Sequence, residues 1–419
     1  MLFMKEHVAK QATRAKEASR KLACVPAEVK NAALMAMADA LEKHQEEILE
    51  VNAKEVAAAK EKGTRVNMID RLTLNPKRIA GMAEGIRQIA KLDDPIGKLD
   101  FEVVRPNGLK IRRVRVPFGV IGIIYEARPN VKADAIALCI KSGNACVLRG
   151  GSEAVRTNKK IVDILREAAT ENGIPEKSIE FLSIIDRDAV VVMCRLRKLI
   201  DVIIPRGGAG LISRVIEHST VPVIETGTGI CHTFVDKTAD FDMAIKICDN
   251  AKTQRPSVCN AMETLLIHKD IAEEFLPKVA SVLREKNVEL RGDEACRKIL
   301  PDMKAAVEED WTTEYSDLIL SIKIVADVDE AIAHINKYSS EHSDAIITND
   351  KENAAKFEQQ VDSAAVYVNT STRFTDGFEF GFGAEIGIST QKLHARGPMG
   401  LEALTTMKYL IDGDGQIRS

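Results

Sequence analysis

Between residues 119 and 218 the sequence alternates regularly between short apolar runs typical of strands and longer amphipathic runs typical of helices. The strand-like runs are 119–125, 146–149, 179–184 and 199–205, and the helix-like runs are 132–141, 153–170, 188–196 and 208–218. This alternation predicts an α/β fold with a parallel sheet covered by helices on both faces. Because ligands of such sheets bind beyond the carboxyl ends of the strands, we expect the turns that follow the strands to carry function.

Two different patterns precede this region. Residues 5–91 are rich in Ala, Glu, Lys and Leu, with apolar residues spaced by three and four, which predicts helices. Residues 101–116 form two strand-like runs joined through Pro106, Asn107 and Gly108, and an Asn-Gly pair suits the turn of a hairpin. We expect this hairpin either to contact another copy of the chain or to be an ordinary ribbon at a sheet edge.

The length and composition limit the number of domains and the classes of partner. At roughly 150 residues per domain, a chain of 419 residues predicts two or three domains. A net charge of -3 lacks the basic surface of nucleic-acid binders, and no apolar run reaches the roughly 18 residues of a membrane span. The eight cysteines show no CxxC spacing and the N-terminus has no signal-peptide pattern, so we expect reduced thiols, a cytoplasmic location and no metal site.

Two of the turns after strands combine arginine with glycine. Their residues are Arg149, Gly150, Gly151 and Ser152 in the first turn, and Arg206, Gly207 and Gly208 in the second. Glycine lets the backbone approach an anion, a helix N-terminus offers free amides, and arginine adds a charge-assisted phosphate contact. Neither turn matches GxGxxG, and each alone is equally well explained as a tight turn with a surface arginine. Their joint occurrence favours a dinucleotide, and Arg149 favours NADP(H) over NAD(H).

One cysteine, Cys259, has the surroundings of a nucleophile. It precedes the strand-like run 261–267, and its neighbours are small, polar or cationic, so that a thiolate can be solvated and stabilised. Glu225 ends an apolar run beside glycine turns, and it is a candidate general base or a carboxylate that caps the following amides. Asn130, between a strand-like and a helix-like run, is a candidate helix cap or a donor to a developing oxyanion.

Several strings of the sequence together resemble the aldehyde dehydrogenase superfamily and, within it, the γ-glutamyl phosphate reductases. They are 120–130 (VIGIIYEARPN), 142–151 (SGNACVLRGG), 201–210 (DVIIPRGGAG), 255–260 (RPSVCN), 367–377 (YVNTSTRFTDG), 380–388 (FGFGAEIGI) and 394–400 (HARGPMG). The resemblance implies a Rossmann-type cofactor domain, an α/β catalytic domain and a small β oligomerisation element. The expected ranges are 1–100 and 117–227 for NADP binding, 228–392 for catalysis, and 101–116 with 393–419 for oligomerisation, where residues 409–418 return to the sheet of a partner.

The resemblance also assigns roles to individual residues. It makes Cys259 the nucleophile, Asn130 an oxyanion donor, Glu225 the general base and Glu314 a contact to the nicotinamide ribose, while the glycine turns hold the cofactor. A substrate carboxylate would be bound by Asn369, Thr372, Arg373 and Arg396, although surface charge near a loop would explain the arginines equally simply.

The activity that the resemblance implies is reduction of γ-glutamyl phosphate by NADPH to glutamate 5-semialdehyde, through a cysteine thioester, in proline biosynthesis. Because water would waste that thioester, Glu225 is expected to matter less than Cys259. The alternatives are a hydrolytic or CoA-acylating aldehyde dehydrogenase, or a catalytically silent protein of the same fold. The implied partners are the small-molecule substrate, further copies of the chain and, as a candidate, a glutamate kinase.

Overall fold

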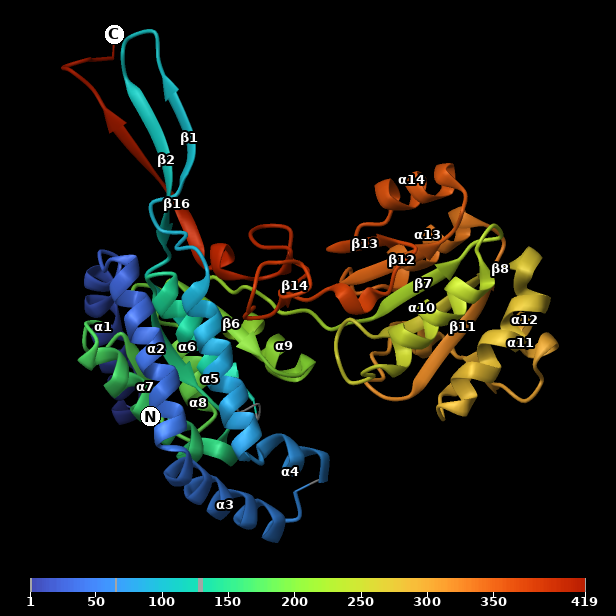
Figure 1. Cartoon of the computed structure of the whole chain (residues 1–419), viewed down its shortest axis with the longest axis horizontal. Coiled ribbons are helices and arrows are strands. Elements are labelled where there is room, and N and C mark those ends of the chain that lie inside the picture. The colour runs from blue at the N-terminus through green and yellow to red at the C-terminus, as the bar shows by residue number, and fades with distance from the viewer. Residues whose placement is uncertain (1, 65, 127–130, 419) are drawn as a thin grey trace. The chain divides into compact units, whose positions relative to one another are not determined.

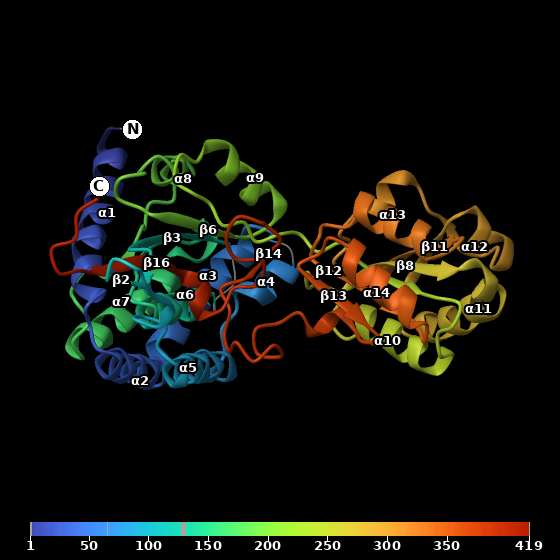
Figure 2. The ribbon, with the colours of Figure 1, turned by 90° about the horizontal axis from the view of Figure 1, so that it is seen from above.

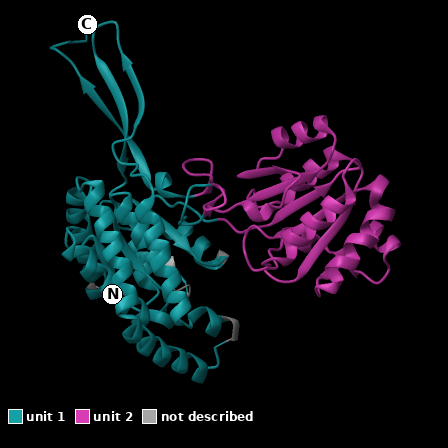
Figure 3. Ribbon diagram, viewed as in Figure 1, with its two compact units in different colours: residues 1–226, 381–387, 399–419 teal, residues 227–380, 388–398 magenta. Residues whose placement is uncertain are grey.

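The computed structural model describes residues 2–64, 66–126 and 131–418, which form two compact units (Figure 3). Unit 1 contains residues 1–226, 381–387 and 399–419, and unit 2 contains residues 227–380 and 388–398. The main division lies one residue from the predicted boundary between 227 and 228. The structure differs from the predicted ranges near the C-terminus, because 381–387 belong to unit 1 and 393–398 to unit 2. The reason is strand pairing, since β14 (Ile388–Ser389) and β15 (Gly397–Pro398) form a two-stranded antiparallel sheet in unit 2.

Unit 1 begins with five helices, which confirms the helical prediction for residues 5–91 (Figure 1). They are α1 (Leu2–Leu22), α2 (Ala27–Lys43), α3 (Gln45–Glu61), α4 (Val66–Leu72) and α5 (Pro76–Lys91). The start of α5 shows how local sequence sets an end: the Asn75 side chain accepts from the Arg78 amide, and Pro76 occupies the first turn, where no amide partner is lost. Helix α2 packs against α5, α6 and α7.

The predicted parallel sheet is confirmed in unit 1. Its strands are β3 (Val120–Tyr125), β4 (Ala145–Arg149), β5 (Ile179–Phe181) and β6 (Val202–Arg206), in the order β5-β4-β3-β6. The connecting helices are α6 (Val131–Lys141), the 3-10 turn η1 (Ser152–Ala154) with α7 (Val155–Glu171), α8 (Asp188–Cys194) and α9 (Ala209–His218). Buried residues of α1, α8 and α9 form one core with strand residues such as Val147 and Ile203, while α6 and α7 contact strands of the same sheet.

A three-stranded antiparallel sheet extends from unit 1 (Figure 1). Strands β1 (Leu99–Val104) and β2 (Lys110–Pro117) form the predicted hairpin, and Gly108 in its turn has a φ of 87°. Strand β16 (Thr405–Asp412), which follows the 3-10 turn η4 (Leu401–Leu404), pairs with β2 along its whole length. Strand β2 of the same chain pairs with one side of residues 409–412. Because β16 is an edge strand of this sheet, its other side is open in the described part of the chain, and the return of residues 409–418 to a partner's sheet stays a prediction.

Unit 2 is built on a seven-stranded parallel sheet in the order β10-β9-β11-β8-β7-β12-β13, with helices around it (Figure 2). The strands are β7 (Cys231–Val235), β8 (Met262–His268), β9 (Glu289–Gly292), β10 (Lys304–Ala305), β11 (Ile319–Val325), β12 (Ser343–Ile347) and β13 (Ala365–Val368). The helices are α10 (Phe241–Thr253), α11 (Lys269–Glu285), α12 (Glu294–Ile299), α13 (Val328–Tyr338) and α14 (Lys351–Gln360), with 3-10 turns η2 (Glu308–Thr312) and η3 (Thr372–Phe374).

Two cores cover the two faces of this sheet, because side chains alternate along each strand. Leu265 and Ile267 of β8 pack in the core that contains α10, α11 and α12, whereas Leu266 packs in the core that contains α13 and α14. Both faces are thus buried, as expected for a parallel sheet. Within the three described ranges, no helix has the length and apolarity needed to span a membrane.

Candidate active site

Cys259 lies in the turn between α10 and β8, at the amino edge of the unit 2 sheet. Of the eight free cysteines, six are buried and Cys24 is exposed, while Cys259 is partly exposed. A nucleophile needs both access and a defined position, and among these thiols Cys259 combines access with a firmly held backbone. Cys259 precedes its strand, as predicted, whereas the two glycine turns of unit 1 follow theirs.

Two residues hold the Cys259 turn, Cys231 at the start of β7 and Gly229 just before it. The buried Cys231 thiol donates to the Cys259 carbonyl oxygen at 3.2 Å, and burial raises the pKa of Cys231, which keeps that thiol protonated as a donor. A Cβ at Gly229 would overlap the Cys259 carbonyl, so only glycine fits the space there. The sequence reasoning missed both roles, although the glycine-rich string 227–229 was a detectable signal.

The next residue, Asn260, ties the Cys259 turn to the segment after β13. Its side-chain amide donates to the carbonyls of Arg373 and Thr375 at 3.2 and 2.9 Å, and its own carbonyl accepts from the Thr372 hydroxyl at 2.7 Å. The structure therefore brings Thr372 and Arg373 beside the Cys259 turn, and their binding of a substrate carboxylate stays a prediction. Thr372 is fully buried and its hydroxyl is committed to this contact, so it supports the turn instead of facing a ligand.

The Arg373 guanidinium is available near the thiol. Its Nε donates to the Gln254 side chain at 2.8 Å, and no ion pair of Arg373 or of Arg255 is found among the described residues. Burial lowers the pKa of Arg373, the positive charge of Arg255 lowers it further, and the negative Cys259 thiolate opposes that shift. The two arginines and the thiol are thus within electrostatic range of one another, which suits an anionic ligand.

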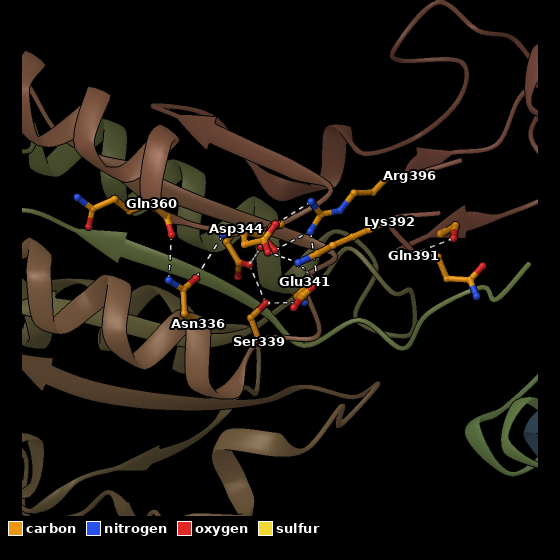
Figure 4. Close-up of polar contacts among 11 residues, drawn as sticks. Asn336, Ser339, Glu341, Asp344, Gln360, Gln391, Lys392 and Arg396 are labelled. Carbon is orange, nitrogen blue, oxygen red and sulfur yellow. Dashed lines mark hydrogen bonds and ion pairs between the residues drawn. The ribbon is translucent and has the colours of Figure 1, made fainter. Parts of the chain in front are cut away.

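The other two predicted carboxylate ligands are engaged elsewhere. Asn369 follows β13 at the carboxyl edge of the sheet, where its side chain bonds to both backbone groups of Thr348. Arg396 pairs with Asp362 at 2.7 Å and with Glu341 at 3.3 Å (Figure 4). The structure does not bring Asn369 to the thiol, and the Arg396 guanidinium already has two carboxylates.

Glu314 lies in the turn between η2 and β11, and the structure brings it toward the thiol. Its charge contributes, after burial, to the raised pKa of Cys231 and to the raised pKa of Glu263. Since Cys231 contacts the Cys259 carbonyl, Glu314 is within electrostatic range of the Cys259 turn.

The two glycine turns of unit 1 lie at one edge of its sheet, since β4 and β6 both flank β3. Arg149 donates to the carbonyls of Gly150 and Ile185 at 2.8 and 3.0 Å. At the second turn, the Gly208 amide donates to the Glu126 carboxylate at 3.0 Å, next to the start of α9. The amide that we expected to be free for a phosphate thus has the Glu126 carboxylate as its acceptor.

The remaining predicted residues are distributed as follows. Gly151 is buried, Ser152 is exposed, Arg206 is half-buried and Gly207 is exposed, all at the same edge of unit 1. Glu225 is half-buried and precedes the division between the units. Asn130 lies outside the described residues. The catalytic and cofactor candidates therefore belong to two units, with Cys259 and Glu314 in unit 2.

A buried histidine next to this site predicts a pH effect. The His342 Nδ1 lies 2.8 Å from the Ser343 hydroxyl and 3.9 Å from the Cys231 sulfur, and burial lowers the pKa of His342 to about 4. As the pH is lowered, His342 is protonated near pH 6.5 in the unfolded chain but only near pH 4 in the folded protein. Its contribution to the free energy of unfolding is therefore complete above pH 6.5 and falls by about 1.4 kcal/mol per pH unit between pH 6.5 and 4. We expect His342→Asn to reduce the slope by about this amount in denaturant titrations, while the buried His334, whose pKa burial lowers to about 3, keeps its own contribution. An unchanged slope would contradict this prediction.

Comparison with known proteins assigns the family. A model of the aldehyde dehydrogenase family matches residues 2–298 and 301–410. The chain belongs to the aldehyde dehydrogenase family. A γ-glutamyl phosphate reductase of Caldanaerobacter subterraneus subsp. tengcongensis is 58% identical over 408 residues, which cover 97% of this chain and 99% of that protein. The predicted resemblance and fold class are thereby confirmed, and the family makes the chain an oxidoreductase with a nicotinamide-binding fold.

Solved structures agree with this membership of the aldehyde dehydrogenase family. γ-Glutamyl phosphate reductase of Thermotoga maritima has a TM-score of 0.97 at 51% identity, over 98% of this chain and 100% of that one. An engineered glycolyl-CoA reductase with bound NADP+ has a TM-score of 0.68 at 15% identity, over 97% of this chain and 96% of that one. The second likeness concerns the fold alone.

Proposed function

We propose that this protein reduces γ-glutamyl phosphate to glutamate 5-semialdehyde with NADPH, releasing phosphate, as a step of proline biosynthesis. The observation that carries the proposal is the partly exposed Cys259 thiol, held by Gly229 and Cys231 within range of two arginines. The names of the relatives at more than half identity support the same substrate. An anionic acyl phosphate with a free carboxylate fits a thiol beside cationic groups.

In the proposed reaction, the Cys259 thiolate attacks the acyl carbon, a C–S bond forms, and the bond to the phosphate oxygen breaks. Inorganic phosphate leaves with the electron pair, and a thioester remains on Cys259. NADPH, when bound, supplies the hydride that reduces this thioester. The Cys259 backbone amide and Asn130 are proposed to stabilise the resulting oxyanion, which collapses to the aldehyde and releases the Cys259 sulfur as a thiolate.

The residues at the glycine turns fit NADP(H). The Gly208 amide already donates to a carboxylate oxygen, so the same donor can meet a phosphate. Arg149, together with Gly150, Gly151 and Ser152, is proposed to bind the extra ribose phosphate, and Arg206 and Gly207 the second turn's anion. Glu314 is proposed to contact the nicotinamide ribose.

The test of this function is an assay in the reverse direction, with glutamate 5-semialdehyde and NADP+. We expect NADPH to form only when inorganic phosphate is present. In the forward direction, a glutamate kinase, which we propose as a partner, can supply the labile substrate. NADPH formation without phosphate would favour the hydrolytic alternative, and formation that depends on CoA would favour the acylating one.

The two arginines near the thiol predict a substrate effect. We expect Arg255→Ala with Arg373→Ala to raise the KM for glutamate 5-semialdehyde roughly tenfold to a hundredfold, with a smaller change in kcat, since charged hydrogen bonds are lost. Arg284→Ala, which removes an exposed arginine paired with Asp302, is the control. An unchanged KM in the double variant would exclude this binding role. Arg396→Ala is measured separately, because it leaves Glu341 and Asp362 without that partner.

We further propose that the sheet of β1, β2 and β16 forms a contact between copies of the chain. Phe101, Tyr409 and Ile411 are 45%, 55% and 60% exposed, and the strand register places them on one face. The same face also carries Arg113, which lies across from both Phe101 and Tyr409, and exposed apolar side chains gathered in this way favour association. We expect Tyr409→Asp with Ile411→Asp to lower the molar mass measured by light scattering, while Val307→Asp in unit 2 should leave it unchanged.

A further inference from the structure

A buried ion pair connects the two ends of the Cys259 turn. Lys252, in the last turn of α10, meets Glu263, at the start of β8, with 2.5 Å between Nζ and Oε2. Both side chains have no exposed surface. Residues 253–262 lie between them, so the pair closes the segment that carries the thiol.

The second oxygen of Glu263 reaches a different turn. Its Oε1 accepts from the Ser316 amide at 3.2 Å, and Ser316 has a φ of 52°, in the left-handed region that a serine rarely adopts. Ser316 is two residues from Glu314. One carboxylate therefore holds both the turn of the proposed nucleophile and the turn of the proposed cofactor contact.

Tyr315, which lies between Glu314 and Ser316, also contacts charged side chains around the ion pair. The Tyr315 hydroxyl donates to Asp310 at 2.8 Å, and its ring has the Lys252 ammonium 5.9 Å and the Arg291 guanidinium 5.1 Å from its centre. These contacts leave the 314–316 turn little freedom on the side that faces Lys252.

Stability alone does not account for this pair. Burial raises the pKa of Glu263 to about 7 and lowers the pKa of Lys252, so both charged forms are penalised despite their mutual attraction. A buried pair can often be replaced by apolar residues without loss of stability. Because the pair is costly to bury and contacts the Cys259 turn and the Glu314 turn, we look for a role other than stabilising the fold.

We propose that Lys252 and Glu263 are positioning residues, which fix the Cys259 turn relative to the Glu314 turn. The inference rests on the proposed function, in which these two turns bind the acyl group and the cofactor. Neither residue touches the reacting atoms. The pair acts through the backbone of both turns.

The first test replaces the whole pair by Lys252→Met with Glu263→Leu, in a Cys24→Ser background that removes the exposed thiol. The readouts are the thermal midpoint, the rate at which iodoacetamide alkylates Cys259, and the Kd for NADPH by fluorescence titration. We expect a midpoint near that of the parent, but a change of about tenfold or more in the alkylation rate and in the Kd, because both turns are misplaced. The control is Lys278→Met with Glu274→Leu, an exposed pair at 2.7 Å on α11.

The second test is Glu263→Gln, which keeps the shape of the side chain. Lys252 and Ser316 donate to different oxygens of Glu263, and a glutamine replaces one of these oxygens by an NH2 group that cannot accept, so one of the two contacts is lost. We expect this variant to fold and to bind NADPH several times more weakly, with a smaller effect on alkylation. If a folded variant of either kind keeps the parent's alkylation rate and Kd, the positioning role is excluded.

These readouts also separate this inference from the proposed function. Alkylation and NADPH binding need no γ-glutamyl phosphate, so they can be altered by the variants even if the parent fails to reduce that substrate. In that case the proposed substrate is wrong and the positioning role stands. If the parent reduces the substrate and the folded variants match it in both readouts, only the positioning role fails.

Discussion

Replacing Cys259 by serine is expected to lower kcat by at least about a thousandfold, because a serine hydroxyl has a much higher pKa than a thiol and does not form the thioester. The measurement is the initial rate of phosphate-dependent NADP+ reduction with glutamate 5-semialdehyde. Cys24→Ser, at an exposed cysteine, is the control and should match the parent. A Cys259→Ser variant with a tenth or more of the parent's kcat would show that the thiol is not the nucleophile.

Glu225→Gln belongs to the same experiment and separates reduction from hydrolysis. A hydrolytic enzyme needs a base to activate water, whereas phosphate release and hydride transfer do not. We therefore expect Glu225→Gln to retain much more activity than Cys259→Ser. Equal, near-total loss in both variants would establish Glu225 as essential.

Gly229→Ala is expected to have the second large effect. The new Cβ would overlap the Cys259 carbonyl, and because the clash is between backbone atoms of Cys259 and the residue 229 Cβ, no flexible side chain can move to relieve it. The turn must shift, which also displaces the carbonyl from the Cys231 thiol, and overpacking of this kind costs about 1–3 kcal/mol of stability. We expect a lower thermal midpoint and, at temperatures where the variant is folded, a kcat reduced about a hundredfold by misplacement of the thiol.

A second glycine provides the comparison for this variant. Gly81 lies exposed in α5, and a Cβ there would meet no atom within 4 Å. Gly81→Ala should leave kcat unchanged and raise stability by up to about 1 kcal/mol, since alanine favours a helix. If Gly229→Ala left kcat and the thermal midpoint as little changed as Gly81→Ala does, the close packing of Gly229 against Cys259 would not matter for activity.

Local patterns predicted most of the secondary structure correctly. The strand and helix of β3 and α6, and the hairpin of β1 and β2, follow from apolar spacing and from one Asn-Gly turn, which depend on residues close in the chain. The thiol was identified in the same way, from the small and cationic residues around Cys259. The partner of β16 was not predicted, because strand pairing joins residues about 290 positions apart and no local pattern specifies it.

The candidate site was predicted only in part, for the same reason. Arg373, a predicted carboxylate ligand, lies within electrostatic range of the thiol, but Arg396 is paired with Asp362 and Glu341, whose positions depend on two other strands. Gly229 stood in a visible glycine turn, yet nothing local shows that it meets the Cys259 carbonyl. The buried Lys252 and Glu263 read as ordinary surface charges until their burial is known.

The sequence by itself determined the order of strands and helices and singled out Cys259 and the two glycine turns as candidates, since periodicity and turn chemistry act within a few residues. Tertiary structure alone decided what surrounds the thiol. The Cys231 contact spans 28 positions, and the contacts of Asn260 with Thr372 and Thr375 span 112 and 115. Such contacts form only when the sheet of unit 2 brings the amino ends of β7 and β8 and the segment after β13 together.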